Sequence, residues 1–342
     1  MRHLNSLDAL RGVAALMVFV HHVQLPGLHP ATLGFDAGVL IFFSLSGYLL
    51  YAPFVRSRNA GIPVNLVGYA IRRAARILPA YLVAAFVTTA IWYPFLLADP
   101  IAIALGTATP IVVVWTLLIE VEFYVALPVM AWLIGRVEER HRIVALMVLA
   151  AFSIGTTATI MAITIRSTGI APSSDLATLV SYVWAFVPGM IVAELQEGDQ
   201  LARPLSSTVP AIGLMLIGTS VALDLPPFFD LAASVGSALL IGWLISRPQF
   251  GGRLAKVSIA LGALSYPLYL WHVQIIDLVD RPSSWGGAFL ALAITAGIGV
   301  VSYLAVERPA IRFSHQLAGF RWRLSGGRPM DPALTPLPED PR

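Results

Sequence analysis

The sequence predicts an all-α membrane protein, a polytopic bundle of about ten transmembrane helices. Of its 342 residues, 57% are hydrophobic and only 12% are charged, whereas soluble proteins carry about 25% charged residues. The mean hydropathy is +0.78, and one compact domain cannot hide so much apolar surface from water. Ten apolar runs approach the ~20 residues that a helix needs to cross the hydrocarbon core. These observations exclude an ordinary soluble enzyme and a disordered chain.

The charge balance does not indicate a nucleic-acid partner. The calculated pI is 9.3, but the formal net charge is only +3. In a membrane protein such an excess reflects loop charges that set the orientation. The chain has no cysteine, which excludes disulfides, thiolate metal sites and a cysteine nucleophile. The histidines lack metal-ligand spacing such as His-x-x-x-His, so we expect no metal site.

The ten predicted spans follow one another with short connections. They are centred on residues 7–24, 37–55, 77–98, 111–134, 143–165, 178–196, 207–224, 229–246, 258–279 and 286–306. The connection at 224–230, like those at 136–142 and 197–206, is short enough to predict an antiparallel hairpin. We predict that the chain has two parts. A membrane domain covers residues 1–313, and a polar, Pro-rich cytoplasmic tail covers residues 314–342.

The basic residues predict the orientation of these spans. With a cytoplasmic amino terminus, 19 of the 22 Lys and Arg residues fall on the cytoplasmic side. Arg166 and Arg281 fall outside, and Arg11 lies within the first span. Such a bias follows the positive-inside rule, so we expect both termini in the cytoplasm.

The first span carries Arg11, His21 and His22. Eleven residues advance a helix by about 16 Å and leave about 20° of rotation, so Arg11 and His22 share one face while His21 points about 100° away. Arg11 lies near the cytoplasm and His22 in the outer half of the span. Two interpretations are open, a functional pair or a snorkelling arginine with a hydrogen-bonded packing histidine. The shared face favours function.

The second span contains Ser44, Ser46 and Gly47 in the segment FFSLSGYLL. Small residues at this spacing more often indicate close helix packing than a nucleophile. We therefore expect this segment to pack tightly against another helix.

A basic segment with Arg72, Arg73 and Arg76 precedes the third span. Arg73 and Arg76 are three residues apart and so are neighbours on a helix face. Paired guanidinium groups suit the binding of phosphate. From this segment alone, positive-inside anchoring to anionic lipid is the favoured alternative.

The fourth and ninth spans carry further ionisable groups. Glu120 and Glu122 are about 200° apart around a helix, so they cannot both face one site. His272 lies in the outer half of the ninth span, at a depth similar to that of His22 and Glu120. Two histidines and a carboxylate at one depth predict either a proton-handling site or a polar cluster that locks helices together, and depth alone does not decide.

These segments form an ordered set of motifs. They are Arg11 with His22 after ten residues, FFSLSGYLL, RRAARILPAY, WTLLIEVEFYVALP, and the closing segments LGALSYPLYLWH and VERP. Together, through residues 5–313, they resemble the acyltransferase-3 family of membrane O-acyltransferases, which modify glycans, lipopolysaccharide, peptidoglycan and macrolides in bacteria. Within the motifs, Thr116 replaces the family's serine after tryptophan, and Val121 stands where a second glutamate is usual. This leaves the role of Glu122 open.

The resemblance implies transfer of an acyl group, usually acetyl, from cytoplasmic acyl-CoA to a hydroxylated acceptor such as a glycan or small metabolite. It also implies a multi-pass protein of the bacterial plasma (inner) membrane. Arg73 and Arg76 would bind the CoA phosphates, with no metal involved. The candidate catalytic residues are His22, as general base or acyl carrier, Glu120, which would orient it, and Arg11; the candidate acceptor-binding residues are His272, Trp115 and Tyr124.

Two other classes of function are weighed beside this one. The first is a transporter or flippase for a lipid-linked or small hydroxylated molecule, whose buried Arg, His and Glu would line a path. Many transporters contain inverted repeats, and the sequence shows no convincing repeat at a half-chain period. The second is a non-catalytic membrane scaffold, which predicts that His22→Ala changes no phenotype.

Overall fold

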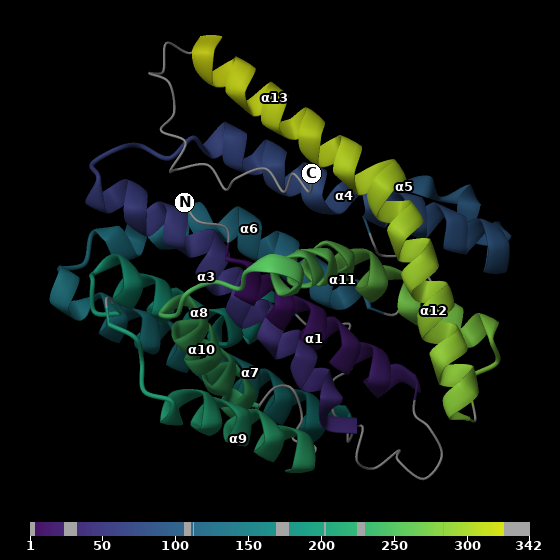
Figure 1. Ribbon diagram of the computed structural model, residues 1–342, viewed down its shortest axis with the longest axis horizontal. Helices are drawn as coiled ribbons and strands as arrows, with labels where there is room; N and C mark the ends of the chain where they lie inside the picture. Colours follow the sequence, from purple (N-terminus) through teal and green to yellow (C-terminus); the bar gives the residue numbers. More distant parts are fainter. Residues whose placement is uncertain are drawn as a thin grey trace. The chain divides into compact units, whose positions relative to one another are not determined.

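The computed structural model is built of helices, and no strand occurs in the residues it describes. Those residues are 4–23, 33–105, 111, 113–168, 178–201, 203–223, 230–282 and 284–324. The helices, shown in Figure 1, are α1 (Asn5–Val23), η1 (Leu33–Asp36), α3 (Ala37–Asn59), α4 (Leu66–Trp92), η2 (Pro94–Ala98), α5 (Pro100–Ala104), α6 (Val114–Gly135), η3 (Glu139–His141), α7 (Arg142–Thr168), α8 (Leu179–Glu197), α9 (Thr208–Leu223), α10 (Leu231–Ile245), α11 (Gly252–Leu278), α12 (Trp285–Ser302), η6 (Tyr303–Glu307) and α13 (Arg308–Leu324).

The predicted all-α membrane bundle is confirmed. Eight helices of the described chain are long and apolar enough to cross a membrane, and α9 and α10 are shorter apolar helices. Each of the ten predicted spans overlaps one of these ten helices. The number of crossings and the cytoplasmic location of the termini stay predictions.

The third span differs most from its predicted bounds. Its helix, α4, begins at Leu66, eleven residues before the predicted start at 77, and the side chain of Asn65 caps it by accepting a hydrogen bond from the backbone N–H of Gly68 at 2.8 Å. The arginines interrupt the apolar run and so lower its hydropathy, but arginine is a good helix former. Arg73 and Arg76 therefore lie within the helix and not in a loop before it.

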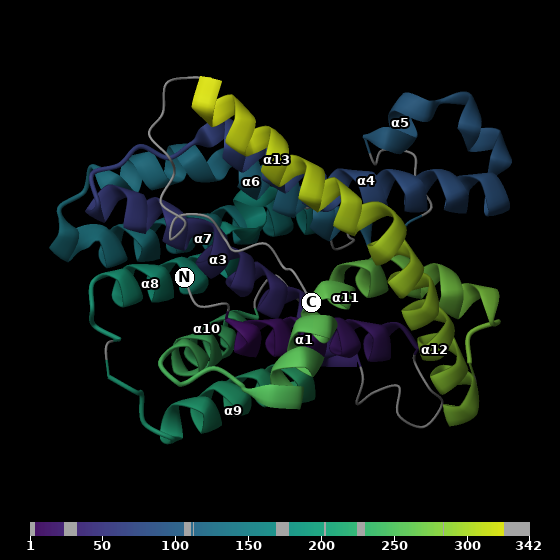
Figure 2. The ribbon, with the colours of Figure 1, turned by 45° about the horizontal axis from the view of Figure 1, so that its top comes forward.

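The carboxyl-terminal segment begins as a helix. Helix α13 spans Arg308–Leu324 and packs against α4, as Figures 1 and 2 show. The first part of the predicted tail, from 314, is therefore helical. Residues 325–342 lie outside the described residues, and the division of the chain at 313 stays a prediction.

The chain divides into two compact units, which we describe separately. The first comprises residues 1–30, 63–114 and 251–342, and the second comprises residues 31–62 and 115–250. Helices α1, α4, α11, α12 and α13 belong to the first unit. Helices α3 and α6–α10 belong to the second.

In the first unit, glycines allow α1 and α11 to approach closely. A Cβ atom on Gly12 would lie 2.7 Å from Cβ of Leu261, and one on Gly262 would lie 2.5 Å from Cβ of Asp8. Small residues at such crossings let helix backbones pack against each other in a membrane. Farther along both helices, His22 of α1 meets His272 of α11. The contacts therefore advance in the same direction and the two helices are parallel, as expected for two odd-numbered spans.

In the second unit, α3 and α8 also pack through glycines. A Cβ atom on Gly47 would clash with the backbone oxygen of Phe186, and one on Gly189 would clash with that of Ser44. The hydroxyl of Ser44 donates to the backbone oxygen of Ala185 at 3.1 Å. The close packing predicted from the small residues of the second span is confirmed.

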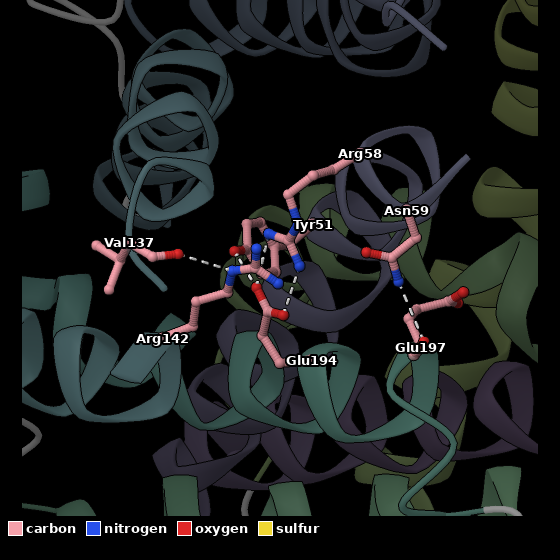
Figure 3. Close-up of polar contacts among 7 residues, drawn as sticks. All are labelled: Tyr51, Arg58, Asn59, Val137, Arg142, Glu194 and Glu197. Atoms are coloured by element: carbon pink, nitrogen blue, oxygen red, sulfur yellow. Dashed lines mark hydrogen bonds and ion pairs between the residues drawn. The ribbon is translucent and has the colours of Figure 1, made fainter. Parts of the chain in front are cut away.

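The same two helices are joined at their carboxyl ends by a polar network (Figure 3). Glu194 of α8 accepts hydrogen bonds from the hydroxyl of Tyr51 at 2.6 Å and from both terminal nitrogens of Arg58 at 3.0 and 2.6 Å. Beside it, the Asn59 amide donates to the backbone oxygen of Glu197 at 3.1 Å. The carboxylate of Glu194 is thus balanced by a charge and three donors, which offsets the cost of its burial.

The hairpin predicted from the connection at 224–230 is confirmed for α9 and α10. Ser220 of α9 donates to the carboxylate of Asp230, just before α10. Farther from the connection, a Cβ atom on Gly213 would lie 2.8 Å from the backbone oxygen of Gly236. The paired residue numbers rise on one helix as they fall on the other, so the two helices are antiparallel.

Candidate active site

His22 and His272 meet in the first unit. Nε2 of His272 lies 3.2 Å from Nδ1 of His22, and the ring centroids are 4.8 Å apart with the planes at 77°. The glycine crossing of α1 and α11 explains this contact. Gly12 packs against Leu261, and His22 and His272 follow these two residues by ten and eleven positions, about 15 to 16 Å of helix. The parallel helices thus bring the two rings to one level.

Each ring is also held by its own helix. Nδ1 of His22 lies 2.9 Å from the backbone oxygen of Val18, and Nδ1 of His272 lies 2.6 Å from that of Tyr269. His272 is fully buried, with the ring centroids of Phe19 and Tyr269 at 6.4 and 5.7 Å. His22 is only half-buried. The pair therefore combines one sealed imidazole with one that keeps an accessible surface.

Arg11 lies on the same helix as His22. Helix α1 is continuous from Asn5 to Val23, so the eleven-residue separation keeps the two side chains on one face. Arg11 is half-buried. The geometric part of the prediction for the first span is met, while the catalytic role of Arg11 stays a prediction.

Glu120 lies on α6 in the second unit, where two hydroxyl groups bind it. Ser46 Oγ donates to its Oε1 at 2.9 Å, and the hydroxyl of Tyr124, one turn along the same helix, donates to the same oxygen at 2.6 Å. These donors stabilise a carboxylate that would otherwise be costly at membrane depth. The sequence analysis predicts only a packing role for Ser46. The signal that identifies Ser46 as a candidate site residue is its position in the motif FFSLSGYLL.

Trp115 begins the same helix that carries Glu120. Its ring lies 5.6 Å from the ring of Tyr182 of α8, at an angle of 46°, and it is half-buried. Tyr124 is buried and binds Glu120. Their role in acceptor binding stays a prediction.

Glu122 has a structural partner. Its Oε2 accepts a hydrogen bond from the backbone N–H of Leu179 at 2.6 Å. Leu179 is the first residue of α8, and the side chain of the preceding Thr178 makes no capping hydrogen bond. Glu122 therefore supplies, from α6, the acceptor that the amino terminus of α8 needs. This gives the residue a role apart from Glu120.

Arg73 and Arg76 lie half-buried in the first half of α4. Their spacing of three residues puts them on adjoining positions of one helix face, as predicted. Helix α13 packs against α4, as Figure 2 shows, and carries Arg308 and Arg312. Paired guanidinium groups on one helix face, such as those of Arg73 and Arg76, suit the binding of phosphate.

The predicted site residues thus fall into two groups. Arg11, His22, Arg73, Arg76 and His272 belong to the first unit. The residues Glu120, Trp115 and Tyr124 belong to the second, so the predicted contact between Glu120 and His22 stays a prediction. Among the residues that the structure describes, no group of three or more His, Asp or Glu side chains converges as metal ligands would.

Comparisons with known proteins agree with the resemblance in the motifs. The family model described as "Acyltransferase domain" (Acyl_transf_3) matches residues 4–306. The chain is 24% identical over 356 residues to "O-acetyltransferase OatA" of Staphylococcus aureus, covering 90% of this chain and 57% of that protein. It is 24% identical over 358 residues to "Putative peptidoglycan O-acetyltransferase YrhL" of Bacillus subtilis, covering 90% and 55%. The chain therefore spans little more than half the length of these curated relatives. No solved structure matches.

Proposed function

The chain belongs to the acyltransferase-3 family, and from this premise we propose that it is a multi-pass O-acyltransferase of a bacterial plasma membrane. The donor is cytoplasmic acyl-CoA, with acetyl-CoA as the preferred form. The acceptor is a hydroxyl of a carbohydrate, glycolipid or macrolide-like molecule. Two relatives named as O-acetyltransferases support the acetyl group and the hydroxyl acceptor. Those names do not favour the alternative of a transporter or flippase.

The contact between His22 and His272 carries this proposal. It places a half-buried imidazole, the side chain best suited to proton transfer near neutral pH, inside a membrane domain of acyltransferase type. His22 removes the proton of the acceptor hydroxyl as that oxygen attacks the acyl carbonyl. A brief acyl-imidazole on His22 is the alternative course.

The remaining candidates complete the scheme. Arg73 and Arg76 bind the phosphates of acyl-CoA, and Arg11, on the face of α1 that carries His22, stabilises negative charge on the donor. Glu120 supplies the carboxylate that stabilises the imidazolium form of His22. Trp115 and Tyr124, which share a helix with Glu120, bind the acceptor.

Mass spectrometry of cell-envelope glycans and secreted metabolites from a deletion strain tests the function. We expect the loss of an acetyl-sized mass and its return on complementation with the intact gene. Complementation with a His22→Ala gene should fail while the protein still reaches the membrane. An unchanged set of acylated molecules in the deletion strain would contradict the proposal.

Purified protein in detergent tests the donor. Acetyl-CoA consumption is followed as free thiol, with the N-acetylglucosamine oligomer chitotetraose as a hydroxyl acceptor. Arg73→Ala should raise the KM for acetyl-CoA about tenfold or more. Arg140→Ala is the matched control, because the Arg140 side chain is 76% exposed and pairs with the exposed Glu138. The KM of this variant should equal that of the wild type. Equal KM values for both variants would remove Arg73 from the donor site.

A further inference from the structure

The hydrogen-bond partners of His272 determine which of its nitrogens carries the proton. The backbone oxygen of Tyr269 can only accept, and it lies 2.6 Å from Nδ1 of His272, so this nitrogen bears the hydrogen. A neutral imidazole has one N–H group. Nε2 of His272 therefore carries a lone pair, and it lies 3.2 Å from Nδ1 of His22.

The same reasoning applies to His22. Its Nδ1 faces two acceptors, the backbone oxygen of Val18 at 2.9 Å and the lone pair of His272 at 3.2 Å. A hydrogen on Nδ1 satisfies both, whereas a lone pair there would face two other lone pairs. In the neutral ring the hydrogen is therefore on Nδ1, and the lone pair is on Nε2.

We propose that His272 is a positioning residue that holds His22 in the Nδ1–H tautomer, so that Nε2 of His22 is the reactive nitrogen. The proposal rests on the proposed acyl transfer for its catalytic meaning. His272 acts through His22 and not on the acceptor, consistent with its complete burial. It thereby orients the ring from the Nδ1 side, as a neutral acceptor that adds no charge to the membrane interior, and leaves to Glu120 the electrostatic stabilisation of the imidazolium.

In the transfer step, Nε2 of His22 then both accepts the proton and gives it back. The acceptor oxygen bonds to the acyl carbonyl carbon, and its proton moves to Nε2 of His22. The imidazolium that forms still donates from Nδ1 to His272, now through a charge-assisted hydrogen bond. The carbon–sulfur bond breaks, and the CoA thiolate takes the proton from Nε2. The ring returns to the tautomer in which it began.

Two substitutions separate the two contacts of His272. In His272→Gln, the longer side chain places its amide oxygen near the position of Nε2, where it accepts from His22. In His272→Asn, the shorter amide lies near the position of Nδ1, where it donates to the backbone oxygen of Tyr269 but does not reach His22. The two variants are matched in polarity and differ by one methylene, so a difference between them reports the contact with His22.

Steady-state kinetics with acetyl-CoA and chitotetraose measure the consequence. His272→Asn should lower kcat about 10- to 100-fold, with KM for both substrates unchanged, because a lost orienting partner acts on the reacting group and not on binding. His272→Gln should stay within about threefold of the wild type, because it restores the acceptor. Equal kcat values for the two variants would overturn the proposal.

Nitrogen-15 NMR of histidine-labelled protein in detergent reads the tautomer without catalysis, with the His22 signals assigned by their absence from His22→Ala. We expect Nδ1–H at His22 in the wild type and in His272→Gln, and a smaller fraction of this tautomer in His272→Asn, where the backbone oxygen of Val18 is the acceptor that is left. An Nε2–H tautomer in the wild type overturns the proposal, even if neither variant folds. Wild-type protein that shows Nδ1–H at His22 but transfers no acyl group contradicts the proposed function and leaves the tautomer assignment standing.

Discussion

The ion pair between Glu194 and Arg58 makes a quantitative prediction about stability. Glu194→Gln removes the charge and turns an amide N–H₂ group toward the guanidinium, which lies 2.6 Å from the carboxylate. Hydrogen bonds to charged groups contribute about 1.5–3 kcal/mol each, and removal of one partner from a buried pair costs about 3–5 kcal/mol. The Arg58 side chain keeps 20% of its surface exposed, so water recovers part of this loss. We expect a decrease of about 2–4 kcal/mol in the free energy of unfolding.

Glu138→Gln is the matched control for this substitution. The side chains of Glu138 and Arg140 are 67% and 76% exposed, and such surface pairs contribute about 0–1 kcal/mol. Both variants are unfolded reversibly in mixed micelles with increasing dodecyl sulfate, and helix content is followed by circular dichroism.

A double substitution sharpens the measurement. Replacing both Glu194 and Arg58 by Met should destabilise the protein less than Glu194→Met alone, because no unpaired charge is left. If Glu194→Gln unfolds at the same free energy as Glu138→Gln, the reasoning from burial and charge is refuted.

Two further predictions concern helix packing and capping. Gly189→Ala should destabilise the protein by about 1–3 kcal/mol, because the new methyl group forces α3 and α8 apart. Gly155→Ala is the control: a Cβ atom there meets open space, so this variant should be neutral or slightly stabilising. Equal unfolding midpoints for the two variants would contradict the close approach of α3 and α8. Glu122→Ala should cost about 0.5–2 kcal/mol, because the backbone N–H of Leu179 loses its acceptor, and should leave kcat for acetyl transfer unchanged. Loss of kcat with normal stability would instead put Glu122 in the active site.

That His22 and His272 lie at one level along their helices could be predicted from the sequence alone. Arg11 and His22 share a face because both lie on one uninterrupted helix, and the helix repeat is fixed. His272 was expected at the level of His22 because both lie in the outer halves of spans of the same direction. The structure adds that their helices are neighbours, so that similar depth becomes a contact of 3.2 Å.

Other relationships were beyond the reach of sequence reasoning. Ser46 and Glu120 are 74 residues apart, and Glu122 and Leu179 are 57 apart. Which helices are neighbours depends on the packing of small residues such as Gly47. No local sequence pattern identifies the helix against which such a residue packs. The early start of α4 was missed for a different reason, since arginines lower hydropathy without interrupting a helix.

The sequence by itself determined that this protein is a bundle of membrane helices, which segments form them, and which family its motifs resemble. These properties are local, because hydropathy, helix length and residue spacing are all set within one segment. Only the tertiary structure decided that His22 faces His272, that Ser46 and Tyr124 bind Glu120, and that Glu122 caps α8. Lipid is as apolar as most side chains, so hydrophobicity does not select helix neighbours in a membrane. Close packing and hydrogen bonds between distant segments make that selection.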